Sequence, residues 1–134
     1  MTDIRNLTES RQQTKHEILE DRMIKFAVTV IRILSEHQDR VPRSVADQLT
    51  RAASSIGANY AEACNASSKL DFRNKIYIAK KETAETRHWL KLCIELTNYD
   101  DWQWCRTEVQ ELLLILQTII NTLKNPKNDN ATSL

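Results

Sequence analysis

The sequence predicts an all-α protein, an up-down-up-down antiparallel four-helix bundle in a single domain over residues 14–125. Glycine occurs once and proline twice among the 134 residues, which is too few for the many tight turns of a sheet protein. Apolar residues recur at steps of three and four through most of the chain, as in amphipathic helices. Hydrophobic residues make up 41% of the chain and charged residues 28%, so the helices can enclose a core beneath a charged surface.

The first two helices are placed by their apolar repeats and by their start signals. Residues 1–13 are polar and without period, and we predict a flexible arm there. Thr14 and the glutamate three residues later have the spacing of a capping box, so the first helix is expected over about residues 15–37. A connection containing proline follows, and Ser44 can cap a second helix over about residues 44–65.

The last two helices follow from the same kinds of signal. Ser68 can start the third helix, expected over about residues 69–97. A polar break comes next, and either of the two aspartates that end it can cap the fourth helix, expected over about residues 101–124. An Asn-Pro pair then stops the helix, and the tail 126–134 is predicted to be disordered.

Two of these helices carry apolar residues outside their main seams. On the third helix, one side about 110° from the seam bears Ile78, Trp89 and Leu92. On the fourth helix, Trp104 and Ile115 share a side away from the seam. A helix that touches two neighbours in a bundle would explain each excess separately. Because both helices show it, we favour an oligomer interface formed by these five residues.

Five cations share one side of the third helix: Lys69, Arg73, Lys80, Arg87 and Lys91. They fall within about 40° of one another and extend about 33 Å along the helix. The net charge of the chain is only +1, but the segment 69–91 holds seven Lys or Arg and three Asp or Glu. This basic stripe is either a solvated face or a nucleic-acid-binding surface, and repetition around a ring of subunits would concentrate its charge.

The second helix carries a polar stripe beside its apolar seam, made of Gln48, Arg51, Ser55, Asn59 and Glu62. Small residues surround this stripe and would let another helix approach closely. We predict a structural polar network in which Arg51 reaches Glu82 or Glu85 on the third helix. Such a network fixes register, because a slip would leave buried polar groups unpaired. A ligand pocket is the alternative.

The same stripe resembles the signature of a known family. The run QLTRAASSIGANYAEA, residues 48–63, is similar to that of bacterial four-helix-bundle proteins, many of which are encoded in intervening sequences of 23S ribosomal RNA genes. The likeness continues through Asp71-Phe72, the run 78–82 and the run 85–90. The resemblance implies a homopentameric barrel of four-helix protomers without established enzymatic activity. It also implies an architectural role for the matching polar positions Arg51, Ser55, Asn59 and Glu62.

A related branch of this family is the accessory variability determinant of diversity-generating retroelements. That protein is a basic pentamer that associates with a reverse transcriptase and nucleic acid. The resemblance therefore implies RNA or DNA as a partner, together with a reverse transcriptase or another nucleic-acid-processing protein. The present chain departs from this branch in being nearly neutral, so the basic stripe is the main support for nucleic-acid contact.

No catalytic residue, metal ligand or cofactor is predicted, and an enzyme is not indicated. Glu85 and His88 have the spacing of half a di-iron site, but no second Glu-x-x-His pair occurs and His88 projects away from the seam. The single glycine excludes a glycine-rich phosphate loop. The three cysteines lack metal-site spacing and are expected to be buried, reduced thiols: Cys64, Cys93 and Cys105.

The longest aliphatic run is five residues, far short of the roughly 20 that span a bilayer, so no membrane contact is expected. The sequence thus predicts a cytoplasmic, non-enzymatic, oligomeric bundle. Its basic stripe is predicted to bind nucleic acid, a nucleic-acid-processing partner, or both. The alternative function is a protein-interaction or scaffolding module without nucleic-acid binding, whose partner docks on exposed apolar residues such as Trp104 or Ile115.

Overall fold

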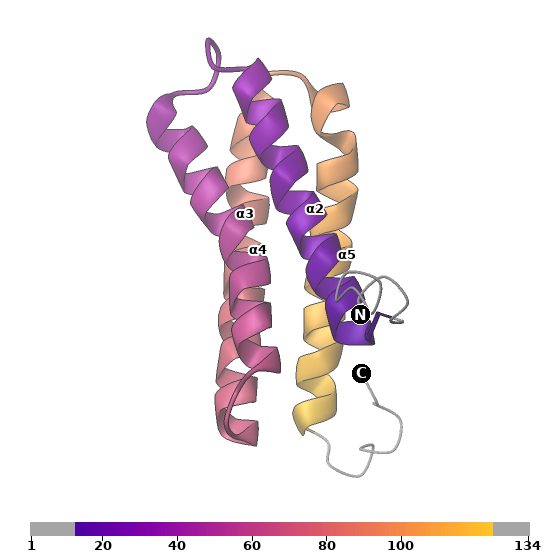
Figure 1. The fold of residues 1–134 in the computed structure, drawn as a ribbon. Coiled ribbons are helices and arrows are strands. Elements are labelled where there is room, and N and C mark those ends of the chain that lie inside the picture. Colours follow the sequence, from indigo (N-terminus) through magenta and orange to yellow (C-terminus); the bar gives the residue numbers. More distant parts are fainter. Residues whose placement is uncertain (1–12, 125–134) are drawn as a thin grey trace, which may run out of the picture.

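The structure is a computed structural model that describes residues 13–124, and it confirms the predicted all-α four-helix bundle (Figure 1). The helices are α2 (Lys15–Glu36), α3 (Arg43–Cys64), α4 (Lys69–Leu96) and α5 (Tyr99–Lys124). The predicted arm, apart from Gln13, and the predicted tail lie outside the described residues.

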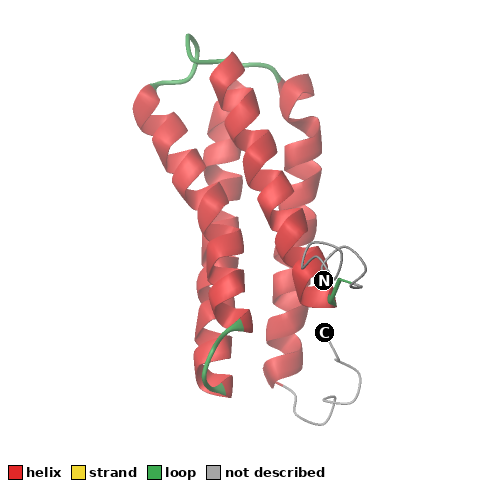
Figure 2. Ribbon diagram, in the orientation of Figure 1, coloured by secondary structure: helices red, strands yellow, loops and turns green. Residues whose placement is uncertain are grey.

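Each helix packs against the two helices that flank it in a closed square. The packed pairs are α2 with α3, α3 with α4, α4 with α5, and α5 with α2; within residues 13–124 no helix contacts the one diagonally opposite. The α2–α3 and α4–α5 connections lie at one end of the bundle and the α3–α4 connection at the other, so neighbouring helices run antiparallel (Figure 2). As a result α4 has two flanks, one facing α3 and the other facing α5.

The core is formed by the apolar seams that the spacing indicates. Its fully buried large side chains include Met23, Phe26, Ile56, Leu90 and Trp102. Two threonines of α4 are also buried, and their hydroxyl groups donate to backbone carbonyl oxygens one turn earlier at 2.7 Å. These hydrogen bonds offset most of the free-energy cost of burying the two hydroxyl groups.

The helix starts agree with two of the expected caps. Thr14 and Glu17 form a reciprocal capping box, with the Glu17 amide donating to Thr14 Oγ1 at 3.2 Å and the Thr14 amide donating to Glu17 Oε2 at 2.9 Å. Ser68 Oγ accepts a hydrogen bond from the Asp71 amide at 3.0 Å. Both contacts satisfy amide groups that have no partner within the helix.

The other two starts fall earlier than expected. α3 begins at Arg43, because the Pro42 carbonyl already accepts hydrogen bonds from two amides of the first turn, so Ser44 is not its cap. α5 begins at Tyr99, because Asn98 Oδ1 accepts a hydrogen bond from the Asp100 amide at 3.1 Å. The two aspartates lie inside the first turn, where their negative charge favours a helix N-terminus.

A shared hydroxyl group fixes the corner between α4 and α5. Thr97 Oγ1 donates to the Cys93 carbonyl oxygen at 2.7 Å and accepts a hydrogen bond from Trp102 Nε1 at 2.8 Å. The indole ring of Trp102 is fully buried, and the His37 ring stacks on it at 6.4 Å between centroids. His37 Nε2 also lies 2.9 Å from Asp101 Oδ2, which connects the end of α2 to this corner.

A partly buried ion pair joins α2 to α5. Glu108 is 8% exposed, and its carboxylate accepts hydrogen bonds from Arg22 Nε at 3.1 Å and from a terminal guanidinium nitrogen at 2.5 Å. Arg22 also contacts the exposed Glu111. The hydrogen bonds that Arg22 donates to Glu108 raise the pKa of Arg22, so the cation is the stable form. This pair was not predicted from the sequence.

Among residues 13–124, no helix has the combination of length and apolarity that crossing a membrane requires.

Candidate functional site: the two flanks of α4

On the flank of α4 that faces α3, charged groups neutralise one another. Arg51 of α3 contacts Glu82 at 3.2 Å and also pairs with Glu85, the two carboxylates named from the sequence. Gln48 Oε1 lies 3.4 Å from Arg51 Nε, and Trp89 Nε1 lies 3.4 Å from Glu85 Oε1. This side of α4 is therefore a polar seam within the protomer.

The remaining polar residues of α3 bond more locally. Ser55 donates to the Arg51 carbonyl oxygen at 2.7 Å, and Asn59 donates to the Ser55 carbonyl oxygen at 2.8 Å, so both are satisfied within their own helix. Glu62 pairs with Lys75 of α4 at 2.6 Å. Acidic and basic groups thus balance along the α3–α4 contact.

The opposite flank of α4 carries the five cations of the basic stripe. Three of them are exposed, namely Lys69, Arg73 and Lys91. The other two, Lys80 and Arg87, are partly buried. Within residues 13–124 none of the five forms an ion pair with a carboxylate, and Arg87 instead donates to the amide oxygen of Gln110 at 3.1 Å. Their charge is therefore available to an outside partner.

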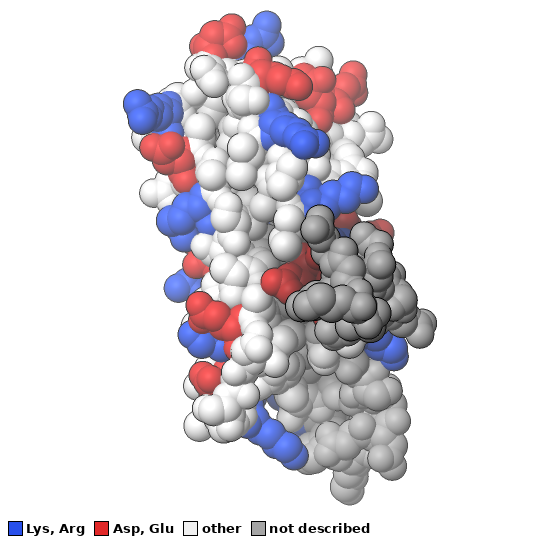
Figure 3. All heavy atoms as spheres, viewed as in Figure 1, with Lys and Arg blue, Asp and Glu red and all other residues white. Residues whose placement is uncertain are grey.

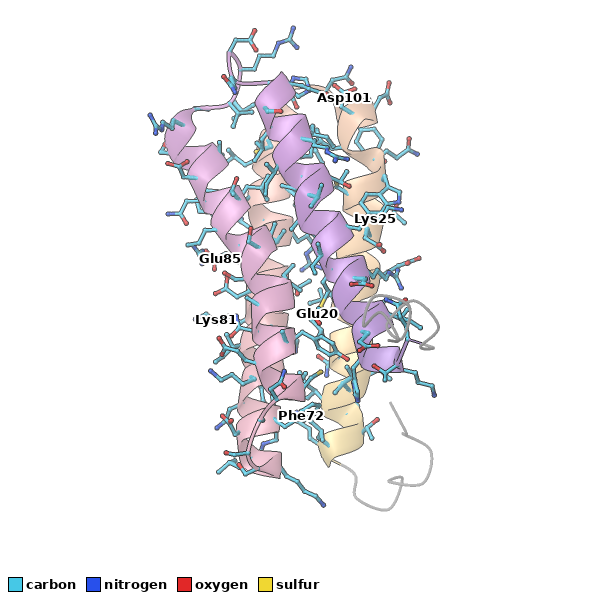
Figure 4. All side chains as sticks on the ribbon, in the orientation of Figure 1. Glu20, Lys25, Phe72, Lys81, Glu85 and Asp101 are labelled. Atoms are coloured by element: carbon cyan, nitrogen blue, oxygen red, sulfur yellow. The ribbon has the colours of Figure 1, made fainter. Side chains whose placement is uncertain are left out.

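The stripe runs along the α5 flank of α4, and a separate depression borders it near each end. At the α3–α4 end, Lys69 and Arg73 border a depression of about 950 Å³ that includes Phe72. Figure 4 labels Phe72 at this end of the bundle. At the other end, Arg87 and Lys91 border a second depression of about 480 Å³. We call this surface the cationic groove.

Helix α5 adds two cations and an aromatic ring to the cationic groove, and α4 adds a second ring. The Arg106 guanidinium lies 5.3 Å from the ring centre of Tyr99, and the Lys124 ammonium lies 5.9 Å from that of Tyr77. These groups were not predicted from the sequence. Arg106 and Lys124 are 18 residues apart, which is five helical turns, and this spacing could have identified them. Cations beside aromatic rings suit phosphates and stacked bases.

The five residues predicted to form an oligomer interface have mixed environments. Trp89 and Ile115 pack partly buried against the core, and Leu92 is also partly buried. Trp104 is 41% exposed, but its ring contacts Phe26 and lies under the Lys25 ammonium at 5.5 Å. Ile78 is 38% exposed. Several of these residues thus serve contacts between neighbouring helices of one protomer.

Both residues of the half di-iron motif have other contacts in the structure. The Glu85 carboxylate pairs with Arg51, and His88 is exposed with its ring against the edge of Trp89. No group of three or more His, Cys, Asp or Glu residues in the part of the chain described could hold a metal ion.

The three cysteines are free, but they are not alike. Cys93 and Cys105 are buried, and burial raises the pKa of these thiols to about 11 and about 12. The prediction that all three are buried is wrong for Cys64, because this residue ends α3 and its side is uncovered there. Partial burial of the Cys64 sulfur still raises its pKa.

We therefore expect a disulfide reagent at pH 7.5 to modify one thiol per native chain, and to do so slowly. Only the thiolate reacts, and a raised pKa keeps its fraction small, so the rate should increase as the pH rises toward and above 9. The Cys64→Ser variant should lose the native-state reaction, and unfolding should release the other two thiols. The absorbance of the thiol that the reagent releases measures the number of reacted cysteines. Reaction of all three thiols in the native chain would contradict the burial of Cys93 and Cys105.

The comparisons with known proteins agree with the helical architecture described above. The model of the 23S rRNA-intervening sequence protein family matches residues 15–124. The chain belongs to this family. A crystal structure of a protein of unknown function from Bacteroides thetaiotaomicron, of the S23 ribosomal protein family, superimposes with a TM-score of 0.67. It is 34% identical in sequence, and the match covers 75% of this chain and 96% of that one.

The comparison with curated proteins gave no match. The match of the family model and the similar crystal structure confirm the family membership predicted from the run 48–63, and neither indicates an enzyme family. The family match extends over all four helices and so includes both flanks of α4.

Proposed function

We propose that this protein is a non-enzymatic, homo-oligomeric member of the family that binds nucleic acid through the cationic groove. The observation that carries the proposal is the contrast between the two flanks of α4. On the α3 flank Arg51 and Lys75 are paired with carboxylates, whereas within residues 13–124 the five cations on the α5 flank have no carboxylate partner. A structural role for charge would predict pairing on both flanks.

The groove supplies seven cations, two from α5 and five from α4, along about 33 Å of helix. Neutralising phosphates releases condensed counterions, so affinity should fall steeply as salt increases. A homo-oligomer would repeat the groove, which offsets the low net charge of one chain. The family resemblance favours five subunits, with a mass about five times the 15.6 kDa of the chain.

The test is a titration of labelled single-stranded RNA, structured RNA and duplex DNA at 50 and 200 mM salt, followed by fluorescence anisotropy. Binding should weaken at least tenfold between these salt concentrations. The variant with Arg73→Glu and Lys80→Glu should bind at least tenfold more weakly, and its plot of log K against log salt should be less steep by about one unit per lost phosphate contact.

A matched control changes the net charge equally on a different surface. Arg32→Glu with Arg40→Glu alters two exposed cations of α2 and the connection after it. This control should bind as the unmodified protein does, after circular dichroism has shown that both variants remain helical. If the control weakens binding as much as the groove variant, only overall charge matters. If no nucleic acid binds at 50 mM salt, the proposal fails and the protein-interaction module becomes the better hypothesis.

A further inference from the structure

A mostly apolar groove runs between α2 and α3, on the side of the square opposite the cationic groove. Its volume is about 310 Å³, and its walls include Ile24, Val28 and Ile31 of α2 and Ser54, Ala58 and Ala61 of α3. Glu20 is the charged member among the described residues that line it. We call this surface the apolar groove.

Side-chain size explains why the groove exists. α3 presents serine, alanine and glycine here, and a Cβ atom on Gly57 would lie only 3.4 Å from Met23 Cβ, so the two helices approach closely. The branched side chains of α2 then stand beside a shallow surface on α3. Figure 4 shows Glu20 toward α3 and Lys25 toward α5, on different sides of α2.

The apolar groove is unusual as a water-facing surface. Ile24, Val28 and Ile31 are 50%, 37% and 42% exposed, although all three are branched aliphatic residues. Figure 3 shows mostly uncharged atoms along the middle of the face formed by α2 and α3, with charged side chains toward its margins. Isolated exposed apolar residues are common, but a contiguous apolar surface with a charged rim is typical of an interaction site.

Helix α5 carries a convex surface of the same character on its outer side. Leu114 is 58% exposed, and residues 112–123 contain no charged side chain on any side of the helix. The exposed neighbours of Leu114 on this outer side include four uncharged residues, Thr107, Gln110, Thr118 and Asn121, and one carboxylate, Glu111, which pairs with Arg22. A helix without charge for about three turns is normally covered on all sides. We call this surface the α5 ridge.

We propose that the apolar groove of one subunit receives the α5 ridge of a second copy of this chain. The two surfaces match in shape, because a groove accepts a convex helix whereas two grooves facing each other leave empty space. They also match in polarity, since residues 112–123 of α5 carry no charge and Glu20 is the charged residue among those that line the groove. The inference rests on the homo-oligomer proposed above and assigns its contact surfaces.

The two surfaces lie on different sides of the protomer, so the contact is head-to-tail. Repetition of such a contact closes into a ring or continues as a filament, and a closed ring agrees with the proposed assembly. The cationic groove shares Thr107 and Gln110 with the α5 ridge, but none of its seven cations belongs to the ridge or to the apolar groove. Each subunit of the assembly would therefore keep its own phosphate-binding surface.

The experiment uses two variants at exposed positions, Ile24→Asp in the groove and Leu114→Asp on the ridge. Light scattering coupled to size exclusion should show the unmodified protein as an oligomer and each variant alone as a chain-sized monomer. Mixing the two variants should then give a species of twice the chain mass. The intact ridge of the first variant can fill the intact groove of the second, and neither partner can extend further.

The matched control is Ile78→Asp, an isoleucine of similar exposure on α4 that belongs to the interface predicted from the sequence. It should leave the oligomer mass unchanged. An unmodified protein that is monomeric at 50 µM would defeat the homo-oligomer itself. An unmodified oligomer that persists in either Asp variant, or that only Ile78→Asp dissociates, would overturn the groove-and-ridge contact alone. Nucleic-acid binding is measured separately, so its outcome does not decide this one.

Discussion

Replacing Trp102 with alanine is expected to lower the free energy of unfolding by about 3–5 kcal/mol. Trp102 is fully buried where α2, α4 and α5 meet, so the change leaves a large cavity that the surrounding side chains cannot fill. The variant also loses the hydrogen bond from the indole nitrogen to Thr97 and the stacked contact with His37. Urea denaturation followed by circular dichroism measures the effect.

Two further variants separate the causes. Trp104→Ala is the matched control on the same helix, and the expected loss is about 1–2 kcal/mol, because Trp104 is 41% exposed and its removal uncovers little. Trp102→Phe keeps most of the side-chain volume but removes the indole N–H donor, so its loss in free energy of unfolding should lie between those of the two alanine variants. If Trp102→Ala and Trp104→Ala lose the same free energy of unfolding, burial of Trp102 does not explain its contribution to stability.

Replacing Arg22 with methionine is expected to destabilise the protein by about 2–3 kcal/mol. Glu108 is nearly buried, and the change removes the guanidinium partner of its carboxylate. The loss should be below that of a fully buried pair, because the Arg22 side chain is 34% exposed and water can replace part of the contact. Urea denaturation at pH 7 measures it.

The double variant Arg22→Met with Glu108→Leu tests the mechanism of that loss. Removing both charges leaves neither partner stranded, so the double variant should recover most of the stability lost in Arg22→Met. Glu111→Ala is the control for the exposed arm of the pair, and its loss should stay below about 1 kcal/mol. A double variant less stable than Arg22→Met would show that Glu108 does not require the cation.

The fold could be predicted because local signals agreed with one another along the chain. Apolar steps of three and four identified residues that the structure buries, such as Met23, Ile56 and Leu90. Thr14 and Ser68 marked helix starts, because each is followed three residues later by an acidic residue. The starts after Pro42 and Asn98 were placed one or two residues late, because backbone carbonyls and a short amide side chain can cap a helix as well as the serine or aspartate that was favoured.

The surfaces were harder to predict than the core. Helical arithmetic placed the five cations of α4 on one side, but it could not reveal which neighbouring helix that side faces. Arg106 and Lys124 belong to another helix and join the stripe only through packing of α5 against α4. Ile24, Val28 and Ile31 were missed, although their steps of four and three along α2 could have identified a second apolar side of this helix.

The corner at Thr97 has a consequence for the spacing of charges on the molecule. One hydroxyl group connects the last turn of α4 to the first indole of α5, so the connection has a fixed length. Inserting or deleting a single residue within α5, between Trp102 and Arg106, would rotate the rest of that helix by about 100° relative to the corner. Arg106 and Lys124 would then turn away from the cations opposite them, and Leu114 would leave the outer side. The rotational phase of one short corner thus determines which surfaces this bundle presents.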